Sequence, residues 1–351
     1  MTSHKMTSME RVLTALSHKE PDRVPLFLLA SMHGAKELGI SIKEYFSNAD
    51  NVVEGQLRIR KKYRNDCIYS FYYAPIEIEA FGGTVIFTED GPPNAGEPFL
   101  KEIEQIKNLT PPKVKEAKVL HRVLDSIQKL KASVKDEVPI ISVAVSPFSL
   151  PVMQMGFEKY LELIYYHPEL FNRLMQINEE FCVDWANAQL EAGATAICFF
   201  DPVSSSTIIP KELYLKTGFL SAKRSIARIK GPTATHFASG NSIPIIDEVA
   251  LTGTAVIGVS SLEDIAEIKE RCKGKLTVLG NLNGVEMRRW TRAETEAIIK
   301  ETIQKAAPGG GFILSDNHGE IPFQVTDDTL LEISEAVHKY GEYPIRAADN
   351  G

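Results

Sequence analysis

Eight short runs of apolar and β-branched residues alternate with segments of helical spacing along this 351-residue chain. We predict strands at residues 24–30, 67–73, 139–145, 195–201, 233–236, 254–259, 276–281 and 311–316. An open doubly wound sheet would be expected to show a glycine-rich phosphate fingerprint after its first strand, but this chain reads SMHGAKELG there. The alternation therefore predicts an α/β protein of a single domain, residues 1–351, folded as a (β/α)8 TIM barrel.

Two segments extend this predicted barrel. Residues 9–17 have helical spacing and predict an N-terminal helical extension. After the second strand, AFGGTVIFTEDGPPNAGEPF places turn residues around a short alternating run, which predicts a hairpin insertion within about residues 77–110. We expect this insertion to lie over the mouth of the barrel.

Local signals predict where several helices begin and end. Pro168 and Gly193 have the positions typical of the first turn and the end of a long helix. Two capping-box patterns predict further helix starts, and they are Ser260 with Glu263 and Thr291 with Glu294.

Composition excludes several classes of partner. A formal charge of −7 and a pI near 5.7 argue against nucleic acid or an anionic membrane as the main partner. No apolar run approaches the roughly 20 residues that span a bilayer, and the first residues lack the apolar core of a signal peptide, so we expect a cytoplasmic protein. The four cysteines stand singly, which favours buried reduced thiols over a disulfide framework or a zinc ribbon.

Several candidate residues, most of them polar, end or follow the predicted strands at their carboxyl ends, where parallel α/β folds bind ligands. The candidates are Met32, His33, Tyr73, Asp201, His236, Asn281, Asn283, Asp316 and His318. Structural alternatives stay open for some of them. Asp201 suits a cap or a loop bridge before Pro202, and Asn281 suits a turn within GNLNG. Tyr73 suits packing, and His236 suits a hydrogen bond within the polar rim of a barrel.

Five segments resemble the uroporphyrinogen decarboxylase superfamily along nearly the whole chain. They are ERVLTALSHKEPDRVP, DCIYSFYYAPIEIEAFG, EAGATAICFFD, GNLNGVEM and GGGFILSDNHGEIP. The decarboxylases of this superfamily carry an arginine-rich stretch after the first strand and an aspartate after the second. Here the first stretch lacks arginine and Tyr73 stands at the position of the aspartate, so the guanidinium groups that would hold a porphyrinogen's carboxylates are missing.

A second branch of the superfamily, the methylcorrinoid:thiol methyltransferases of the coenzyme M type, holds zinc with a His-x-Cys motif and a later cysteine. His236 is followed by Phe237 and Ala238, and the last loop, SDNHGE, contains no cysteine. The remaining candidates, His236, Asp316 and His318, would form a weak zinc site. We therefore expect no resident metal, although a zinc-dependent thiol methyltransferase remains the nearest alternative.

The third branch fits these departures best. The chain resembles the zinc-free methylcorrinoid:tetrahydrofolate methyltransferases of glycine betaine metabolism, the MtgA type. The resemblance implies methylcobalamin on a partner corrinoid protein as donor and N5 of tetrahydrofolate as acceptor. A thiol needs zinc to become a thiolate, whereas a secondary amine is nucleophilic when neutral. A non-catalytic corrinoid-binding module is the alternative from another class of protein.

The same resemblance implies roles for the candidate residues. A pterin ring presents two adjacent N–H donors that one carboxylate can accept together, which makes Asp201 and Asp316 catalytic candidates, with His236 as a ligand or base. Asn281 suits the pterin carbonyl and ring nitrogens. The other expected substrate-binding residues are Asn283, Tyr73, His318, Met32 and His33.

Overall fold

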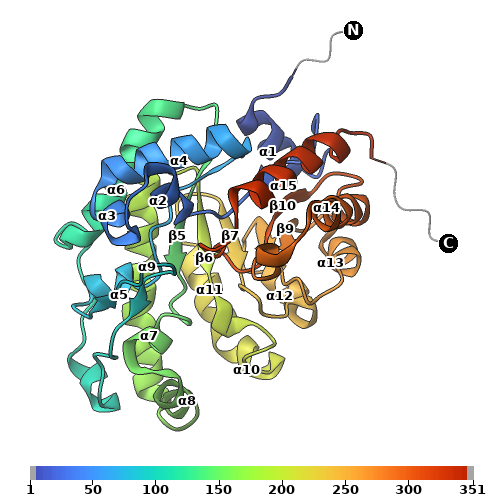
Figure 1. Cartoon of the computed structure of the whole chain (residues 1–351). Helices are drawn as coiled ribbons and strands as arrows, with labels where there is room; N and C mark the ends of the chain where they lie inside the picture. Colours follow the sequence, from blue (N-terminus) through green and yellow to red (C-terminus); the bar gives the residue numbers. More distant parts are fainter. Residues whose placement is uncertain (1–4, 346–351) are drawn as a thin grey trace.

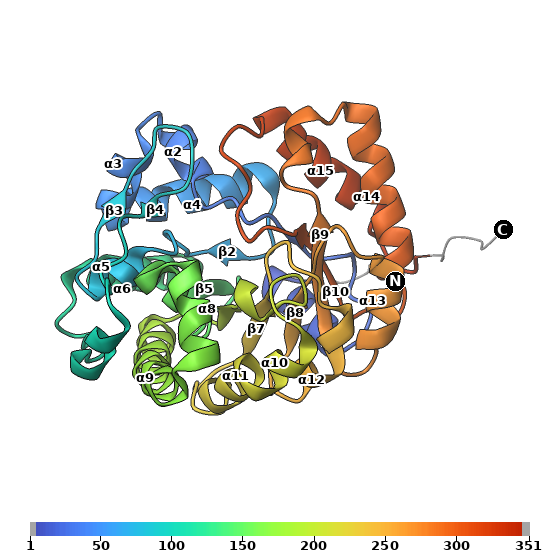
Figure 2. The same ribbon diagram turned by 90° about the horizontal axis from the view of Figure 1, so that it is seen from below.

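A computed structural model describes residues 5–345 of the chain as a nearly closed barrel of parallel strands surrounded by helices (Figures 1 and 2). The strands are β1 (Leu26–Phe27), β2 (Ile68–Tyr69), β5 (Ile140–Val145), β6 (Ala196–Phe200), β7 (Thr233–His236), β8 (Val256–Gly258), β9 (Thr277–Leu282) and β10 (Phe312–Asp316). They are hydrogen-bonded in the order β1-β10-β9-β8-β7-β6-β5-β2, every pair parallel. The predicted (β/α)8 barrel is confirmed.

Helices cover the outside of this barrel (Figure 1). They are α1 (Ser8–Leu16), α2 (His33–Leu38), α3 (Ile42–Ser47), α4 (Ala49–Tyr63), α5 (Ile76–Ala80), α6 (Lys118–Val134), α7 (Pro151–Met155), α8 (Phe157–Tyr166), α9 (Pro168–Ala192), α10 (Lys211–Lys216), α11 (Gly218–Ile226), α12 (Ile246–Ala250), α13 (Ile265–Cys272), α14 (Arg292–Ala306) and α15 (Asp327–Tyr340). Short 3-10 turns lie at Ile103–Asn108, Pro202–Ser204, Ile243–Ile245 and Glu286–Arg289. Within residues 5–345, no helix is both long and apolar enough to cross a bilayer.

Alternation along the strands builds two layers of core. In β10, Phe312 and Leu314 pack outward in the large cluster that includes residues of the surrounding helices, whereas Ile313 packs in the barrel interior with Cys198 and Leu279. This period of two is the pattern expected of a barrel strand with both faces covered. All four cysteines are buried and free.

Most of the predicted helix signals are confirmed. The long helix α9 begins at Pro168 and is followed by Gly193, whose φ of +118° places it in the left-handed region that favours glycine. Thr291 and Glu294 form a capping box at the start of α14.

The second predicted capping box, at Ser260 with Glu263, is wrong. Helix α13 begins later, and Asp264 caps it by accepting a hydrogen bond from the backbone N–H of Ala266. The Glu263 carboxylate is occupied elsewhere, because it accepts hydrogen bonds from the backbone N–H groups of the neighbouring loop, including that of Ser242 at 2.8 Å. A long-range contact has replaced the local one.

The two predicted additions to the barrel are present. Helix α1 forms the N-terminal extension. After β2 and α5, strands β3 (Val85–Ile86) and β4 (Asn94–Ala95) pair as an antiparallel hairpin (Figure 2). The hairpin stands outside the eight-stranded sheet.

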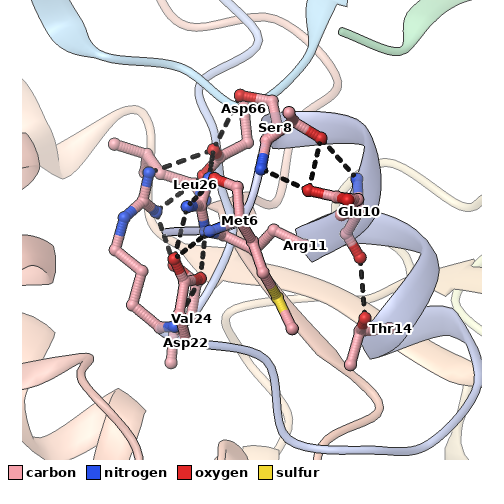
Figure 3. A network of polar contacts seen from close by, with 11 residues as sticks. Met6, Ser8, Glu10, Arg11, Thr14, Asp22, Val24, Leu26 and Asp66 are labelled. Carbon is pink, nitrogen blue, oxygen red and sulfur yellow. Dashed lines mark hydrogen bonds and ion pairs between the residues drawn. The ribbon is translucent and has the colours of Figure 1, made fainter. Parts of the chain in front are cut away.

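Strands β1 and β2, the two ends of the strand order, are joined by a polar network, shown from close by in Figure 3. The backbone N–H of Asp66 donates to the carbonyl of Leu26 at 2.8 Å, and the Asp66 carboxylate accepts the N–H of Leu26 at 2.9 Å. The same carboxylate binds Arg11 at 2.6 Å and Arg23 at 2.7 Å, while Arg11 also binds Asp22 at 2.6 Å. The network thereby attaches helix α1 to the junction between β1 and β2, which we call the seam of the barrel.

Candidate active site

A cavity of about 480 Å³ opens at the mouth of the barrel, within the range of small-molecule sites. Tyr69 from β2, Val143 from β5 and Phe200 from β6 line its floor. The hairpin contributes the wall from Pro92 to Pro98, and the loop after β10 contributes residues 318–320. The cavity is therefore largely apolar and aromatic, and its lining residues include no lysine or arginine.

The acidic side chain that lines this cavity is Glu320. Its carboxylate accepts a hydrogen bond from the hydroxyl of Ser31, in the loop after β1. Burial raises the pKa of Glu320 to about 8 against the effect of that hydrogen bond, and the nearby Asp316 adds to the rise. A carboxyl group with such a pKa can take up or release a proton near neutral pH.

Asp316, predicted as a catalytic residue, ends β10 directly behind the lining loop. Its side chain is fully buried and accepts hydrogen bonds from the backbone N–H groups of Leu29 at 3.4 Å and His318 at 3.1 Å. Burial raises its pKa to about 7. Asp316 holds the loop that presents His318 and Glu320 to the cavity, and it is not itself a lining residue.

His236, at the end of β7, is buried beside the wall of the cavity. Its Nδ1 accepts the backbone N–H of Ala238 at 3.0 Å, which assigns the proton of the neutral ring to Nε2. Within the described chain this Nε2 has no hydrogen-bond partner. The ring packs on Phe200 with centroids 5.9 Å apart, and burial, followed by the influence of His318, lowers the pKa of His236 to about 4.

His318 lines the cavity and is half-buried, and burial lowers its pKa. It follows Asp316 closely in sequence, but the structure does not gather the predicted zinc candidates into one cluster. Among residues 5–345, no group of three or more histidine, cysteine, aspartate or glutamate side chains is arranged to hold a metal ion.

Asp201, the other predicted catalytic carboxylate, bridges two loops. Its Oδ1 accepts hydrogen bonds from the hydroxyls of Ser146 at 2.5 Å and Ser149 at 2.7 Å, both in the loop after β5. Burial raises its pKa against these bonds. The residue does not line the cavity, so the structure shows the loop-bridge contact that its position before Pro202 allowed.

Asn281 and Asn283 lie on a separate hollow of about 580 Å³ beside α13 and α14. The Asn281 amide donates to the carbonyl of Ser260 at 2.9 Å. Asn283 accepts the backbone N–H groups of Val285 and Glu286, each at 3.1 Å, as a turn residue does. The structure thus places the two asparagines together, apart from the aromatic cavity.

The remaining candidates are packed in the protein interior. Tyr73 packs on Phe87 with ring centroids 5.4 Å apart, and its hydroxyl donates to Glu79 at 3.3 Å. Met32 and His33 are fully buried, and burial lowers the pKa of His33 to about 3. None of these three candidates is among the lining residues.

Several lining residues escaped the sequence analysis. Phe200 lay within a run that predicted only a buried strand, and Tyr69 lay inside the second predicted strand. The Tyr69 hydroxyl donates to the carbonyl of Gly319 at 2.8 Å, so it also fixes the last loop. Glu320 was visible in SDNHGEIP, where the sequence analysis singled out Asp316 and His318, but it lies farther from the strand end.

The known proteins that resemble this chain fall into two groups, uroporphyrinogen decarboxylases and a methyltransferase. The family model described as Uroporphyrinogen decarboxylase (URO-D) matches residues 7–340. A uroporphyrinogen decarboxylase from Idiomarina loihiensis is 22% identical over 355 residues, covering 94% of this chain and 96% of that protein. One from Nitrosospira multiformis is 26% identical over 286 residues, covering 78% and 76% respectively.

Among solved structures, a methyltransferase from Methanosarcina mazei superposes with a TM-score of 0.80 at 19% identity, covering 95% of this chain and 99% of that one. At this identity the match supports the fold alone. The extent of the family match, from α1 to the end of α15, agrees with the segments that carry the resemblance in the sequence. This chain belongs to the uroporphyrinogen decarboxylase (URO-D) family.

Proposed function

We propose that the protein is a methyltransferase that moves a methyl group from a methylcorrinoid, carried by a partner protein, to N5 of tetrahydrofolate. The observation that carries the proposal is the lining of the mouth cavity. It combines aromatic walls with one carboxyl group, Glu320, and contains no lysine or arginine. Such a lining suits a flat, uncharged ring with N–H donors better than a polyanion.

Glu320 takes the role in pterin recognition that the sequence suggested for Asp201 or Asp316. In its ionised form it can accept the two adjacent N–H donors of a pterin, and bonds of this charge-assisted kind contribute about 1.5–3 kcal/mol each. Phe200 and Phe71 supply apolar surface for the ring. Asp316 acts through the loop it holds, and direct contacts of Asp201 and His236 with the ligand remain predictions.

The chemistry asks little of the chain beyond placement and a proton acceptor. A bond forms between N5 and the methyl carbon, the bond from cobalt to that carbon would break with its electron pair left on cobalt, and the N5 proton passes to water or to a carboxylate. A secondary amine needs no metal to become nucleophilic, so the residues must orient two ligands and exclude water. The apolar lining residues Val143, Val152, Met153 and Phe200 suit the exclusion of water.

The second candidate is uroporphyrinogen decarboxylation, because the curated relatives carry that name. A substrate with many carboxylates calls for guanidinium clamps. Neither the loop SMHGAKELG nor the lining of the cavity provides an arginine. We therefore place this function second.

An anaerobic assay separates the candidates. Chelator-treated protein is given methylcobalamin with tetrahydrofolate or with a small thiol, while cob(I)alamin is followed by its absorption spectrum, and uroporphyrinogen is offered in a parallel reaction. We expect turnover with tetrahydrofolate alone. Turnover with thiol only after zinc is restored, or loss of carboxyl groups from uroporphyrinogen, would overturn the proposal in favour of the corresponding enzyme.

A further inference from the structure

A second, basic cavity of about 350 Å³ lies at the opposite end of the barrel, beside the seam between β1 and β2. Its lining contains six lysine or arginine residues and two acidic ones. The basic residues are Lys5, Arg11, Arg23, Arg60, Lys61 and Arg64. This concentration of positive charge is unexpected in a chain whose formal net charge is −7.

Two of these cations are already neutralised. Arg11 binds the Asp66 carboxylate at 2.6 Å and also binds Asp22 (Figure 3), and Arg23 binds Asp66 at 2.7 Å. Asp66 therefore offers no spare negative charge to the rest of the cavity. The other acidic lining residue is Glu137.

The other four cations lack ionic partners. Lys5, Arg60, Lys61 and Arg64 form no ion pair within residues 5–345, and Arg64 only donates from Nε to the hydroxyl of Ser334 at 3.3 Å. The Nε of Arg60 is buried and has no hydrogen-bond partner in the described chain. That nitrogen is shielded from solvent, whereas the side chains of Lys5, Lys61 and Arg64 are exposed, so these three cations are accessible to an anion in the cavity.

Helix electrostatics explain only part of this arrangement. Arg60 and Lys61 lie in the last turn of α4, where cations complement the helix dipole. That effect does not satisfy the Arg60 Nε, and it does not bring Lys5 from the N-terminal segment to the same cavity. His338 of α15 lines it too, and burial together with the nearby Arg23 and Arg64 lowers the pKa of His338.

We propose that this basic cavity binds a multiply charged oxyanion of the diphosphate class. Cations converge on it from the N-terminal segment, the end of α4 and the turn before β2, as a ligand with several anionic oxygens requires. Guanidinium groups such as those of Arg60 and Arg64 match phosphate oxygens in pairs. Because the cavity borders the network of Asp66, a bound anion stabilises the seam of the barrel and the docking of α1.

Isothermal titration calorimetry on the full chain tests this site, with inorganic diphosphate in one arm and ADP in the other. We expect binding of inorganic diphosphate that weakens with added salt. Arg60→Gln should weaken it about tenfold or more, and Lys61→Gln should also weaken it. The matched control is Arg58→Gln, which removes a cation of the same helix that lies outside the cavity and pairs with Glu54.

The outcomes are distinct. Binding lost in Arg60→Gln and kept in Arg58→Gln supports the site, and tighter binding of ADP than of diphosphate would identify a nucleotide as the source of the phosphates. No heat and no rise in the thermal unfolding midpoint at millimolar diphosphate overturns it. Equal weakening in both variants also overturns it, because it indicates attraction by general surface charge. None of these outcomes depends on the methyl-transfer proposal.

Discussion

The two ends of the barrel bury carboxyl groups in opposite electrostatic surroundings. At the seam, Asp66 contacts two guanidinium groups within 2.7 Å. At the mouth, Asp316 and Glu320 accept hydrogen bonds from backbone N–H groups and a hydroxyl, and burial raises their pKa values to about 7 and 8. Counter-charges hold the first carboxylate, whereas the other two have no cationic partner, and of these only Glu320 lines the cavity.

This contrast separates carboxyl groups that hold the fold together from carboxyl groups that can bind a ligand. A carboxylate with its full set of cationic partners holds chain segments together and has little capacity left for a ligand. A buried carboxyl group without a cation favours a partner that brings N–H donors, as proposed for Glu320. The same reasoning, with signs reversed, applies to Arg60 in the basic cavity.

The largest expected effect is at the seam. Asp66→Asn leaves Arg11 and Arg23 buried without their shared counter-charge, and we expect the free energy of unfolding to fall by about 3–5 kcal/mol. Urea denaturation followed by circular dichroism measures this change. A loss below about 1 kcal/mol would contradict the view that the network closes the barrel.

At the mouth, removing the negative charge of Glu320 should weaken ligand binding more than it destabilises the fold. Glu320→Gln should weaken tetrahydrofolate binding about 10- to 100-fold, because charge-assisted bonds contribute about 1.5–3 kcal/mol. Anaerobic calorimetry measures it, with Glu286→Gln, a carboxylate of the separate hollow, as the matched control. A larger loss in Asp201→Asn would instead place the pterin at Asp201, as the sequence analysis expected.

Glu77 allows the effect of burial on a carboxyl group to be tested without any ligand. Glu77 accepts the backbone N–H of Val145 at 2.8 Å, and burial raises its pKa from 4.5 to about 8. The folded chain holds this proton where the unfolded chain releases it, so its contribution to stability is complete below about pH 4.5 and is lost as the pH rises towards 8. Glu77→Gln should reduce the loss of stability between pH 5 and 8 by about 1–3 kcal/mol, measured by denaturation at each pH. Parallel pH profiles for the variant and the parent chain would reject this explanation.

The smallest effect is expected where both partners face solvent. Glu54 and Arg58 form an exposed pair on α4 at 2.7 Å. Glu54→Gln should change the free energy of unfolding by about 0.5 kcal/mol or less, and raising the salt concentration should remove the difference. A loss comparable with that of Asp66→Asn would mean that burial does not distinguish these ion pairs.

The sequence predicted the framework well because its signals are local. Strand runs, the limits of α9 at Pro168 and Gly193, and the capping box at Thr291 depend on neighbours a few residues away. Glu263 failed as a local signal because Ser242 lies 21 residues away in the chain and takes its carboxylate. Only the tertiary structure brings these two loops together.

The candidate site was less predictable for the same reason. The sequence identified strand ends, but it could not show that Asp201 points at Ser146 and Ser149, or that Asn281 faces another hollow. Glu320 lies four residues beyond Asp316, and the Tyr69–Gly319 and Ser31–Glu320 contacts place it. Contacts spanning 250 and 289 residues leave no periodic trace in a sequence.

The hairpin of β3 and β4 separates two tasks that evolution can then treat independently. Residues from Pro92 to Pro98 form one wall of the cavity, yet the hairpin contributes no strand to the eight that close the barrel. A lineage that rewrites this excursion changes the shape offered to a ligand while the inherited framework stays intact. Substrate specificity within this family can therefore change without changes to the barrel, and the hairpin is the segment to graft between relatives when a new specificity is engineered.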